Sequence, residues 1–454
     1  MGDPADPVRS GTGEEEVTVS PQRRQEILDA LRRGTVPQRS LDALAVGLGR
    51  FEKAFDEELA TVARGGATFK AVRGEYGSGK TFFARWLQER ALGRGFAVAE
   101  VQVSETETPL HRLETVYRRL IERLRTQDCM TGAWRSIVEG WFFTLEQDVL
   151  AEGGVEENNH AVLNQRVSEL MEKRLAAITR TAPSFAVALR AYRQAVVAGD
   201  GAIAEGLMAW LGGQPNIGAE VKRRAMLKGD VDHFGALSFL QGLLVMLRDS
   251  GRPGLLFVLD EVETLQRVRT DVREKSLNAL RQLIDEVDSG RFPGLYVLIT
   301  GTGAFYDGPQ GVQRLPPLAQ RLHVDFGSET KFDNPRAPQV RLPGFGQELL
   351  EEVGRKVRDL FVSGSAAAGR VANKVDDRCV AGLAQNVVGQ LGGKVGVAPR
   401  VFLKKLVVEL LDKVDQFEDF DPARDGRIAL NDSELTATER AARGASDPDD
   451  IQLP

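Results

Sequence analysis

The chain has 454 residues, 42% of them hydrophobic, so it is long enough to bury a large core and to form two or three structural units. Its net charge of -6 argues against a surface that binds nucleic acid over its whole extent, although a local basic patch remains compatible with it. The two cysteines, Cys129 and Cys379, lie far apart and lack the spacing of a metal site, which favours a reduced cytoplasmic protein. Neither a secretion signal nor an apolar run of about 20 residues is apparent, so we expect no membrane partner.

The first segments predict a disordered lead followed by helices. Residues 1–20 are rich in Pro, Gly and Glu, a composition typical of disorder. Apolar side chains recur at helical spacing over Pro21–Arg33, and Gly34 is a plausible helix stop. A further helix is expected at Arg50–Ala63. We therefore interpret residues 21–127 as N-terminal helices and the first part of a nucleotide-binding core.

An apolar stretch, Thr68–Val72, leads into a full phosphate-binding motif and then into a predicted helix. Glycines allow the backbone N–H groups of such a loop to turn inward around phosphates, and Lys80 adds positive charge at the β and γ oxygens. The Thr81 hydroxyl can ligate Mg²⁺. The motif comprises Gly74, Glu75, Tyr76, Gly77, Ser78, Gly79, Lys80 and Thr81. ATP with Mg²⁺ is the predicted ligand, and a glycine-rich surface turn is the alternative.

A long helical segment is predicted in the middle of the chain. Phe96–Val103 has the apolar pattern of a second core strand. About 180 residues separate Lys80 from Asp260, which is more than a minimal nucleotide-binding core needs. We therefore predict a helical insertion over residues 128–232. Its aromatic side chains are expected to form its own core: Trp134, Trp141, Phe142, Phe143, Tyr192 and Trp210.

Residues 233–345 are expected to complete the core, and the segment Gly254–Glu261 is its most informative part. A continuous apolar run that ends in two carboxylates is typical of a strand buried on both faces of a parallel sheet. At the carboxyl end of that strand, Asp260 is predicted to hold Mg²⁺ and Glu261 to polarise the attacking water. Glu263 lies beyond the strand end, and we expect it to be solvated.

The next predicted strand, within Gly294–Thr302, is also buried, and a hydroxyl residue, Thr300, ends it. Parallel strands place their carboxyl ends at one edge of a sheet. We therefore expect Lys80 and Asp260 to face each other across adjacent strand tips.

The remaining chain predicts a helical lid over residues 346–415. One of its helices begins near Pro399, which favours a first-turn position, and Arg400 follows at once. Residues 416–454 are rich in Asp, Ala, Ser and Pro and are interpreted as a disordered acidic tail.

These features follow one another in the order found in AAA+ ATPases, and the chain resembles that family from about Val46 to Asp415. The lid pattern Gly-x-x-x-Arg is similar to that of the replication-initiator and helicase-loader clade. Three shorter stretches resemble the BrxD family of ATP-binding proteins from BREX phage defence: Arg24–Pro37, Val46–Arg50 and Phe69–Thr81. The fold class that the resemblance implies is α/β, an AAA+ P-loop NTPase with a parallel sheet core, a large helical insertion and a C-terminal helical lid.

The resemblance also implies roles that the residues alone do not assign. In AAA+ proteins a polar residue at the end of this strand holds the attacking water, which selects Thr300 first and Thr302 second. An arginine before the next strand reaches the γ-phosphate of a neighbouring subunit, which selects Arg321, with Arg314 and then Arg336 as alternatives. A guanidinium suits that task because it stays charged and presents two donors to phosphate oxygens.

Two further contacts are implied within one subunit. Arg400, at the start of a lid helix, matches the second-sensor arginine that touches the nucleotide in cis. The bend at Val46 and Gly47 lies where AAA+ proteins contact the adenine base, and an ordinary turn between two helices is the alternative.

The implied function is an ATP hydrolase that forms a homo-oligomer and hydrolyses ATP at subunit interfaces. The BREX resemblance implies an accessory or helicase-loader-like ATPase that acts with DNA-processing machinery in bacterial phage defence, with a helicase and DNA as partners. Basic residues in Val221–Lys228 and around Arg273 are candidates for DNA contact, and a solvated helix face is the alternative. The alternative function is a signalling NTPase switch that releases or recruits an effector on nucleotide turnover.

Overall fold

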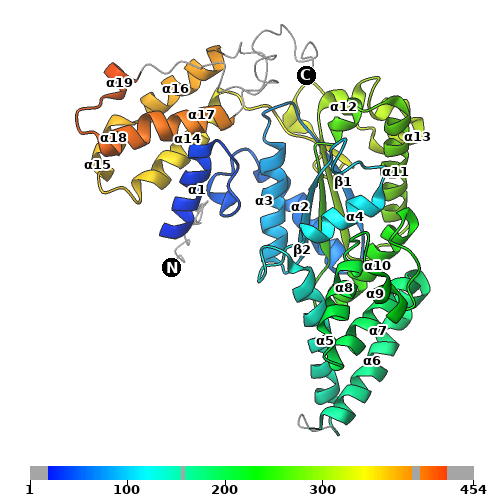
Figure 1. Cartoon of the computed structure of the whole chain (residues 1–454). Coiled ribbons are helices and arrows are strands. Elements are labelled where there is room, and N and C mark those ends of the chain that lie inside the picture. The colour runs from blue at the N-terminus through cyan, green and yellow to red at the C-terminus, as the bar shows by residue number, and fades with distance from the viewer. Residues whose placement is uncertain (1–18, 155–158, 391–398, 427–454) are drawn as a thin grey trace, which may run out of the picture.

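The computed structural model describes residues 19–154, 159–390 and 399–426 (Figure 1). Within these residues the fold is mixed α/β and mostly helical, with one five-stranded parallel sheet in the order β2-β3-β4-β1-β5. The strands are β1 (Thr68–Arg73), β2 (Ala97–Gln102), β3 (Leu255–Asp260), β4 (Leu295–Gly301) and β5 (Gln339–Arg341).

The strand order corrects one expectation from the sequence. β4 pairs with β1 on one side and with β3 on the other, so the tips of β1 and β3 are not adjacent. Every residue of β3 and β4 is buried, which explains their continuous apolar sequences. All five strands still direct their carboxyl ends to the same edge of the sheet.

Each face of the sheet packs against its own set of helices. Alternate side chains along a strand point to opposite faces. Leu256 and Val258 join a core with α2 (Gly49–Ala63) and α3 (Lys80–Gly93) on one face. Leu255 and Phe257 point to the other face, where the covering helices are α4 (Leu113–Glu122), α10 (His233–Asp249) and α11 (Thr270–Asp288).

The segment predicted as a helical insertion consists of helices joined by short connections. These helices are α5 (Ala133–Glu152), α6 (His160–Thr181), α7 (Pro183–Val197), α8 (Gly201–Leu211) and α9 (Ala219–Arg224). Five of the six aromatic residues singled out in the sequence are buried, whereas Phe143 is 61% exposed. Their cluster is continuous with the core on the α10 face of the sheet, so this region extends that core and does not have a separate one.

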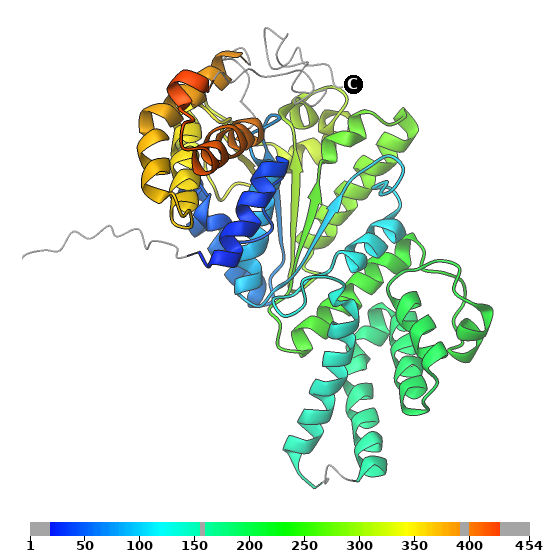
Figure 2. The same cartoon turned by 60° about the vertical axis from the view of Figure 1, so that its left-hand side comes forward.

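The helical region is attached to the amino-terminal edge of the sheet. Before it, the backbone of Arg125 exchanges two hydrogen bonds of 2.9 Å with Val98, near the start of β2. After it, the carbonyl of Gly254, directly before β3, accepts a 3.0 Å bond from the Ala97 N–H. Figures 1 and 2 show α5, α6 and α7 projecting away from this edge. The region therefore lies at the opposite end of the sheet from the phosphate-loop motif.

The C-terminal helices form a second body with its own hydrophobic core. They are α14 (Gln347–Val362), α15 (Ala368–Lys374), α16 (Asp377–Gln390), α17 (Pro399–Lys405), the π-helical turn η5 (Leu406–Leu411), α18 (Asp412–Gln416) and α19 (Pro422–Asp425). We call this body, residues 347–390 and 399–426, the lid.

The N-terminal helix α1 (Pro21–Arg33) packs with the lid, although the sequence analysis grouped it with the nucleotide-binding core (Figure 2). Ile27 and Leu28 belong to the same buried cluster as Phe402. Arg32 donates two hydrogen bonds, 2.9 and 2.7 Å long, to the two carboxylate oxygens of Asp412. By its packing, α1 is thus a helix of the lid.

The lid also extends further than the predicted boundary at residue 415. Lys374 Nζ donates to the carbonyl oxygens of Glu418 (2.7 Å) and Phe420 (2.8 Å), and α19 follows. Residues 416–426, predicted as part of the acidic tail, are therefore packed on the lid. The rest of that tail and residues 1–18 of the predicted lead lie outside the described residues.

Short helices complete the connections. They are η1 (Leu41–Ala43), η2 (Val262–Gln266), α12 (Gly303–Asp307), η3 (Val312–Arg314), α13 (Pro316–Leu322) and η4 (Thr330–Phe332). Of the helices in the described ranges, none combines the length and the apolar character that crossing a bilayer requires.

A buried ion pair anchors β1, the strand that leads into the phosphate-loop motif. The Nζ of Lys70 lies 2.5 Å from Glu58 Oε1 and donates to the carbonyl of Ala337 at 2.7 Å. The other oxygen of Glu58 accepts a 2.5 Å bond from the hydroxyl of Tyr296 on β4. Burial lowers the pKa of Lys70 and raises the pKa of Glu58, and each partner opposes the shift of the other.

Lys70→Met is expected to lower the free energy of unfolding by about 3 kcal/mol, because it leaves Glu58 buried without its counter-charge. Urea denaturation followed by tryptophan fluorescence measures the effect. Lys53→Met, at an exposed position on α2, is the matched control and should leave the midpoint unchanged. Equal midpoints for both variants would show that the buried pair contributes nothing to stability.

Candidate functional site

The phosphate-loop motif connects β1 to α3 at the carboxyl edge of the sheet. Gly77 and Gly79 have φ values of 78° and 87°, a region that favours glycine. A Cβ atom on Gly74 would collide with the Ser78 hydroxyl, so this position also requires glycine. The loop ends at the first turn of α3, where backbone N–H groups without helical partners can bind anions.

Lys80 points into the concave side of the loop. Its side chain is only 9% exposed, and Nζ donates to the carbonyl oxygens of Gly74 (2.8 Å) and Glu75 (3.2 Å). Nζ also lies 5.2 Å from the centre of the Tyr76 ring and 3.8 Å from Glu263 Oε1. The ammonium group is therefore held inside the loop by main-chain oxygens, with one carboxylate opposite.

Thr81 and Asp260 meet, although β4 separates their strands. The Thr81 hydroxyl donates a 3.0 Å hydrogen bond to Asp260 Oδ2, and the Thr300 hydroxyl donates to Asp260 Oδ1. Asp260 is buried, and burial raises its pKa, an effect that the bond from Thr300 opposes. Each oxygen of the Asp260 carboxylate thus accepts a hydrogen bond from a threonine, and one of these threonines, Thr81, belongs to the phosphate loop.

The residues at this point fit Mg²⁺. Hydroxyl and carboxylate oxygens are ligands that Mg²⁺ prefers, and the ion usually keeps several waters and phosphate oxygens as its other ligands. Within the described parts of the chain, no group of three or more His, Cys, Asp or Glu side chains is arranged to hold a metal by itself. A site made by Thr81, Asp260 and a phosphate ligand agrees with both observations.

Glu261 follows Asp260 with left-handed backbone angles, φ 59° and ψ 44°. This conformation is uncommon for a residue other than glycine, and such residues are found at functional sites. The carboxylate of Glu261 is exposed and accepts a 2.7 Å hydrogen bond from Gln102 Nε2 at the end of β2. Gln102 was not identified from the sequence.

The prediction that Glu263 is solvated is wrong, because its residue exposure is only 4%. The short helix η2 begins directly after the strand and turns Glu263 back towards the phosphate loop. Burial raises the pKa of the Glu263 carboxyl to about 7, and the charge of Lys80 opposes that shift. Sequence position past the strand end gave no sign of this arrangement.

A cavity of about 330 Å³ lies above the phosphate loop. One end is polar and is formed by the loop and by Asp260, Glu261 and Glu263. The other end is largely apolar and is formed by the lid and by the segment that follows α1. The lining residues of that end include Leu31, Gly34, Thr35, Val36, Pro37, Leu44, Val46, Leu48, Phe345, Val353, Pro399, Arg400 and Leu403.

Most of the site residues predicted from the sequence line this cavity. Residues 76–81, Val46 and Arg400 do, together with Asp260 and Glu261. The others do not line it: Gly47, Gly74, Glu75, Thr300, Thr302 and Arg321. Residues 34–37 were missed as lining residues, although they include a predicted helix stop and end one of the three stretches that resemble the BrxD family.

The three arginines considered as intersubunit residues lie away from the cavity. Arg321, on α13, has Nη2 2.6 Å from Asp285 Oδ1 on α11. The two alternatives also form ion pairs within the chain: Arg314 with Glu274 (3.6 Å) and Arg336 with Glu57 (2.8 Å). Within one subunit, none of these three arginines lines the cavity.

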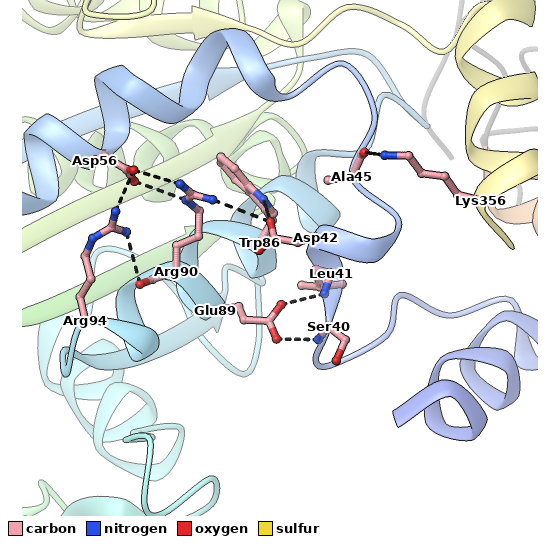
Figure 3. A network of polar contacts seen from close by, with 10 residues as sticks. All are labelled: Ser40, Leu41, Asp42, Ala45, Asp56, Trp86, Glu89, Arg90, Arg94 and Lys356. Atoms are coloured by element: carbon pink, nitrogen blue, oxygen red, sulfur yellow. Dashed lines mark hydrogen bonds and ion pairs between the residues drawn. The ribbon is translucent and has the colours of Figure 1, made fainter. Parts of the chain in front are cut away.

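The cavity wall after α1 is tied to α3, the helix that begins at Lys80 (Figure 3). The Glu89 carboxylate accepts hydrogen bonds from the backbone N–H groups of Ser40 (2.5 Å) and Leu41 (2.7 Å). The indole of Trp86 donates a 2.7 Å bond to Asp42 Oδ1. These contacts fix the apolar wall relative to the phosphate loop.

The lid contacts the same wall. Figure 3 shows Lys356, on α14, donating a 2.6 Å hydrogen bond to the carbonyl of Ala45. Together with the pair between Arg32 and Asp412, this bond joins the wall to the lid on one side while α3 holds it on the other. The cavity wall therefore has polar contacts with both the lid and α3.

The basic residues considered for DNA contact are partly committed elsewhere. Arg273 is buried and donates to the backbone carbonyls of Leu265 and Val268, so it stabilises the turn at η2. In the basic run at α9, Lys222 pairs with Asp230 at 2.6 Å. These residues offer less positive charge to a ligand than the sequence indicates.

A protein-family model described as BREX system ATP-binding protein BrxC/D matches residues 19–428. The match therefore spans the sheet, the helical region between β2 and β3, and the lid. No curated protein matches the chain.

Proposed function

The chain belongs to the BREX BrxC/D family of ATP-binding proteins, and from that premise we propose that it is an AAA+ ATPase. It binds ATP with Mg²⁺ in the cavity above the phosphate loop and hydrolyses it at interfaces between copies of the chain. It acts with DNA-processing machinery, as an accessory or helicase-loader-like ATPase, in phage defence.

One observation carries this proposal: the 3.0 Å contact between Thr81 and Asp260 beside the buried ammonium of Lys80, at the polar end of a cavity with an apolar wall. A nucleotide has an apolar base and an anionic tail, so it matches both ends of the cavity. Lys80 and the loop N–H groups would bind the tail, and the wall around Val46 would contact the base.

The residues of the polar end receive separate roles. Thr81 and Asp260 would hold Mg²⁺, which neutralises charge that develops on the β and γ phosphates. Glu261 would polarise the attacking water, and Gln102 would hold its carboxylate until the substrate is in place. Thr300 is bonded to Asp260, so we assign it the positioning of that carboxylate in addition to the water contact implied by the resemblance.

Two arginines would contact the γ-phosphate, one from the same subunit and one from a neighbouring copy. Arg400 lines the cavity from the first turn of α17, so it can contact the nucleotide within the same subunit. Arg321 lies at the surface on α13 and would complete the site of a neighbouring copy. Such arginines contribute roughly 10³- to 10⁵-fold to the rate in other phosphoryl-transfer enzymes.

The shared-site proposal is tested by measuring ATP hydrolysis per subunit over a wide range of protein concentration, with Mg²⁺. The specific activity is expected to rise as copies associate. Arg321→Ala should lower kcat by roughly 10³-fold and leave ATP affinity nearly unchanged. Arg166→Ala, which removes an exposed arginine on α6, is the matched control.

Concentration-independent turnover together with an inert Arg321→Ala variant would contradict hydrolysis at subunit interfaces. Duplex or single-stranded DNA, added to the same assay, is expected to stimulate turnover if the protein acts with DNA machinery. Slow turnover with tight retention of nucleotide, unaffected by DNA, would instead favour a signalling switch.

A further inference from the structure

Glu263 is a buried carboxylate whose position the proposed hydrolysis steps do not explain. Its Oε1 lies 3.8 Å from Lys80 Nζ, too long for a hydrogen bond but close enough for strong electrostatic attraction. Its Oε2 is buried and has no hydrogen-bond partner among the described residues. An ionised side chain is rarely buried with so few partners, because desolvation is costly.

Every element around Glu263 directs a polar or charged group towards it. The phosphate loop contributes Lys80 and Tyr76, the end of β3 contributes Asp260 and Glu261, and α12 contributes Tyr306. The Tyr306 hydroxyl is likewise buried without a partner. Lys80 supports the charge of Glu263, whereas Asp260 and Glu261 oppose it. Two arginines act on the neighbouring tyrosines: Arg267 on Tyr76 and Arg73 on Tyr306.

We infer that Glu263 is a positioning residue that competes with the phosphate tail of the nucleotide for Lys80. This inference rests on the proposed nucleotide site. In the nucleotide-free protein, Glu263 and the carbonyls of Gly74 and Glu75 hold the ammonium group inside the loop. The phosphate groups of an entering nucleotide must replace Glu263 as the partner of the Lys80 ammonium group. In doing so they bring negative charge close to the Glu263 carboxylate.

The competition has a defined consequence for affinity. Like charges at such distances in a partly desolvated pocket oppose each other strongly, and the effect grows with the charge of the ligand. Glu263 therefore weakens binding of a triphosphate more than binding of a diphosphate. It also speeds release of nucleotide, since its carboxylate remains beside Lys80 to recapture it.

The test compares equilibrium binding of ATP and ADP to the full chain and to Glu263→Gln, which keeps the shape and removes the charge. ATP affinity is expected to rise about tenfold in the variant, with a smaller gain for ADP. Glu263→Asp keeps the charge and should bind close to the wild type. Glu169→Gln removes an exposed carboxylate on α6, far from the loop, and is the control for net charge.

A pH series separates this role from a structural one. A carboxyl with a pKa of about 7 is mostly charged at about pH 8 and mostly neutral at about pH 6. The advantage of Glu263→Gln over the wild type should therefore be largest at about pH 8 and small at about pH 6. If Glu263 had only a structural role, Glu263→Gln would change thermal stability, but the ratio of its ATP affinity to that of the wild type would not depend on pH.

Unchanged ATP and ADP affinities in a folded Glu263→Gln variant would overturn the inference and leave the proposed ATP site intact. Loss of hydrolysis at unchanged affinity would also overturn it, because that result would make Glu263 a catalytic residue. If Glu263→Gln does not fold, two other results decide against the inference. One is a wild-type ATP affinity that does not decrease between about pH 6 and about pH 8. The other is a Glu263→Asp variant with an altered preference for ATP over ADP. A wild-type protein that binds no ATP would defeat the proposed function itself.

Discussion

Lys80→Ala is expected to weaken ATP binding by roughly 100-fold, the loss that corresponds to one or two charge-assisted hydrogen bonds. The Lys80 ammonium group lies inside the phosphate loop, 2.8 Å from the Gly74 carbonyl, and is buried from solvent. Without it, the loop N–H groups and the first turn of α3 must hold the anionic tail alone. Isothermal titration calorimetry with ATP and Mg²⁺ measures the loss directly.

The matched control for this substitution is Lys53→Ala on the exposed face of α2. Both variants remove one lysine, so a difference between them isolates the position and not the net charge. Circular dichroism should show that both variants are folded, although Lys80→Ala also leaves the buried Glu263 carboxylate without the ammonium group beside it. Equal ATP affinities for the two variants would show that nucleotide binds elsewhere.

Glu261→Gln is expected to lower the rate of hydrolysis by about 10²- to 10⁴-fold while ATP binding is retained. Glu261 lines the cavity beside Asp260, and its carboxylate accepts a hydrogen bond from Gln102, so its loss should remove the polarisation of water and spare the phosphate contacts. Single-turnover hydrolysis of ATP measures the chemical step. The trapped ATP should also stabilise the assembled form, which size-exclusion chromatography detects.

Glu105→Gln, in the exposed loop after β2, removes a carboxylate at the same edge of the sheet and serves as the control. It should hydrolyse ATP at the wild-type rate. A Glu261→Gln variant with normal single-turnover kinetics would contradict the assignment of Glu261 as the residue that polarises water. Attention would then move to Glu263, the other carboxylate within reach of the tail.

The parts of the site that the sequence predicted are those that depend on local pattern. The phosphate loop is recognisable because a glycine-rich turn between a strand and a helix must have particular residues at particular positions. The strand ending at Asp260 is recognisable because burial on both faces demands a continuous apolar run. That Thr81 and Asp260 meet, 179 residues apart, follows once both strands direct their carboxyl ends to one edge.

The parts that could not be predicted depend on tertiary packing. Glu263 is buried because η2 turns the chain back after β3, and no short pattern distinguishes that turn from a solvated loop. The order of strands was also hidden, since β4 enters between β1 and β3 only through long-range pairing. Likewise, Ile27 and Leu28 give α1 an apolar face without indicating that Phe402 covers it.

Packing of α1 on the lid has a mechanical consequence. The lid body is joined to the sheet body by two stretches of chain, residues 34–48 after α1 and residues 342–346 between β5 and α14, and both stretches contribute walls to the cavity. A body tethered by one connection can swivel in any direction, whereas a body tethered at two points turns mainly about the line between them. Because both stretches line the cavity, we expect the lid to open and close mainly by rotation about the line that joins them.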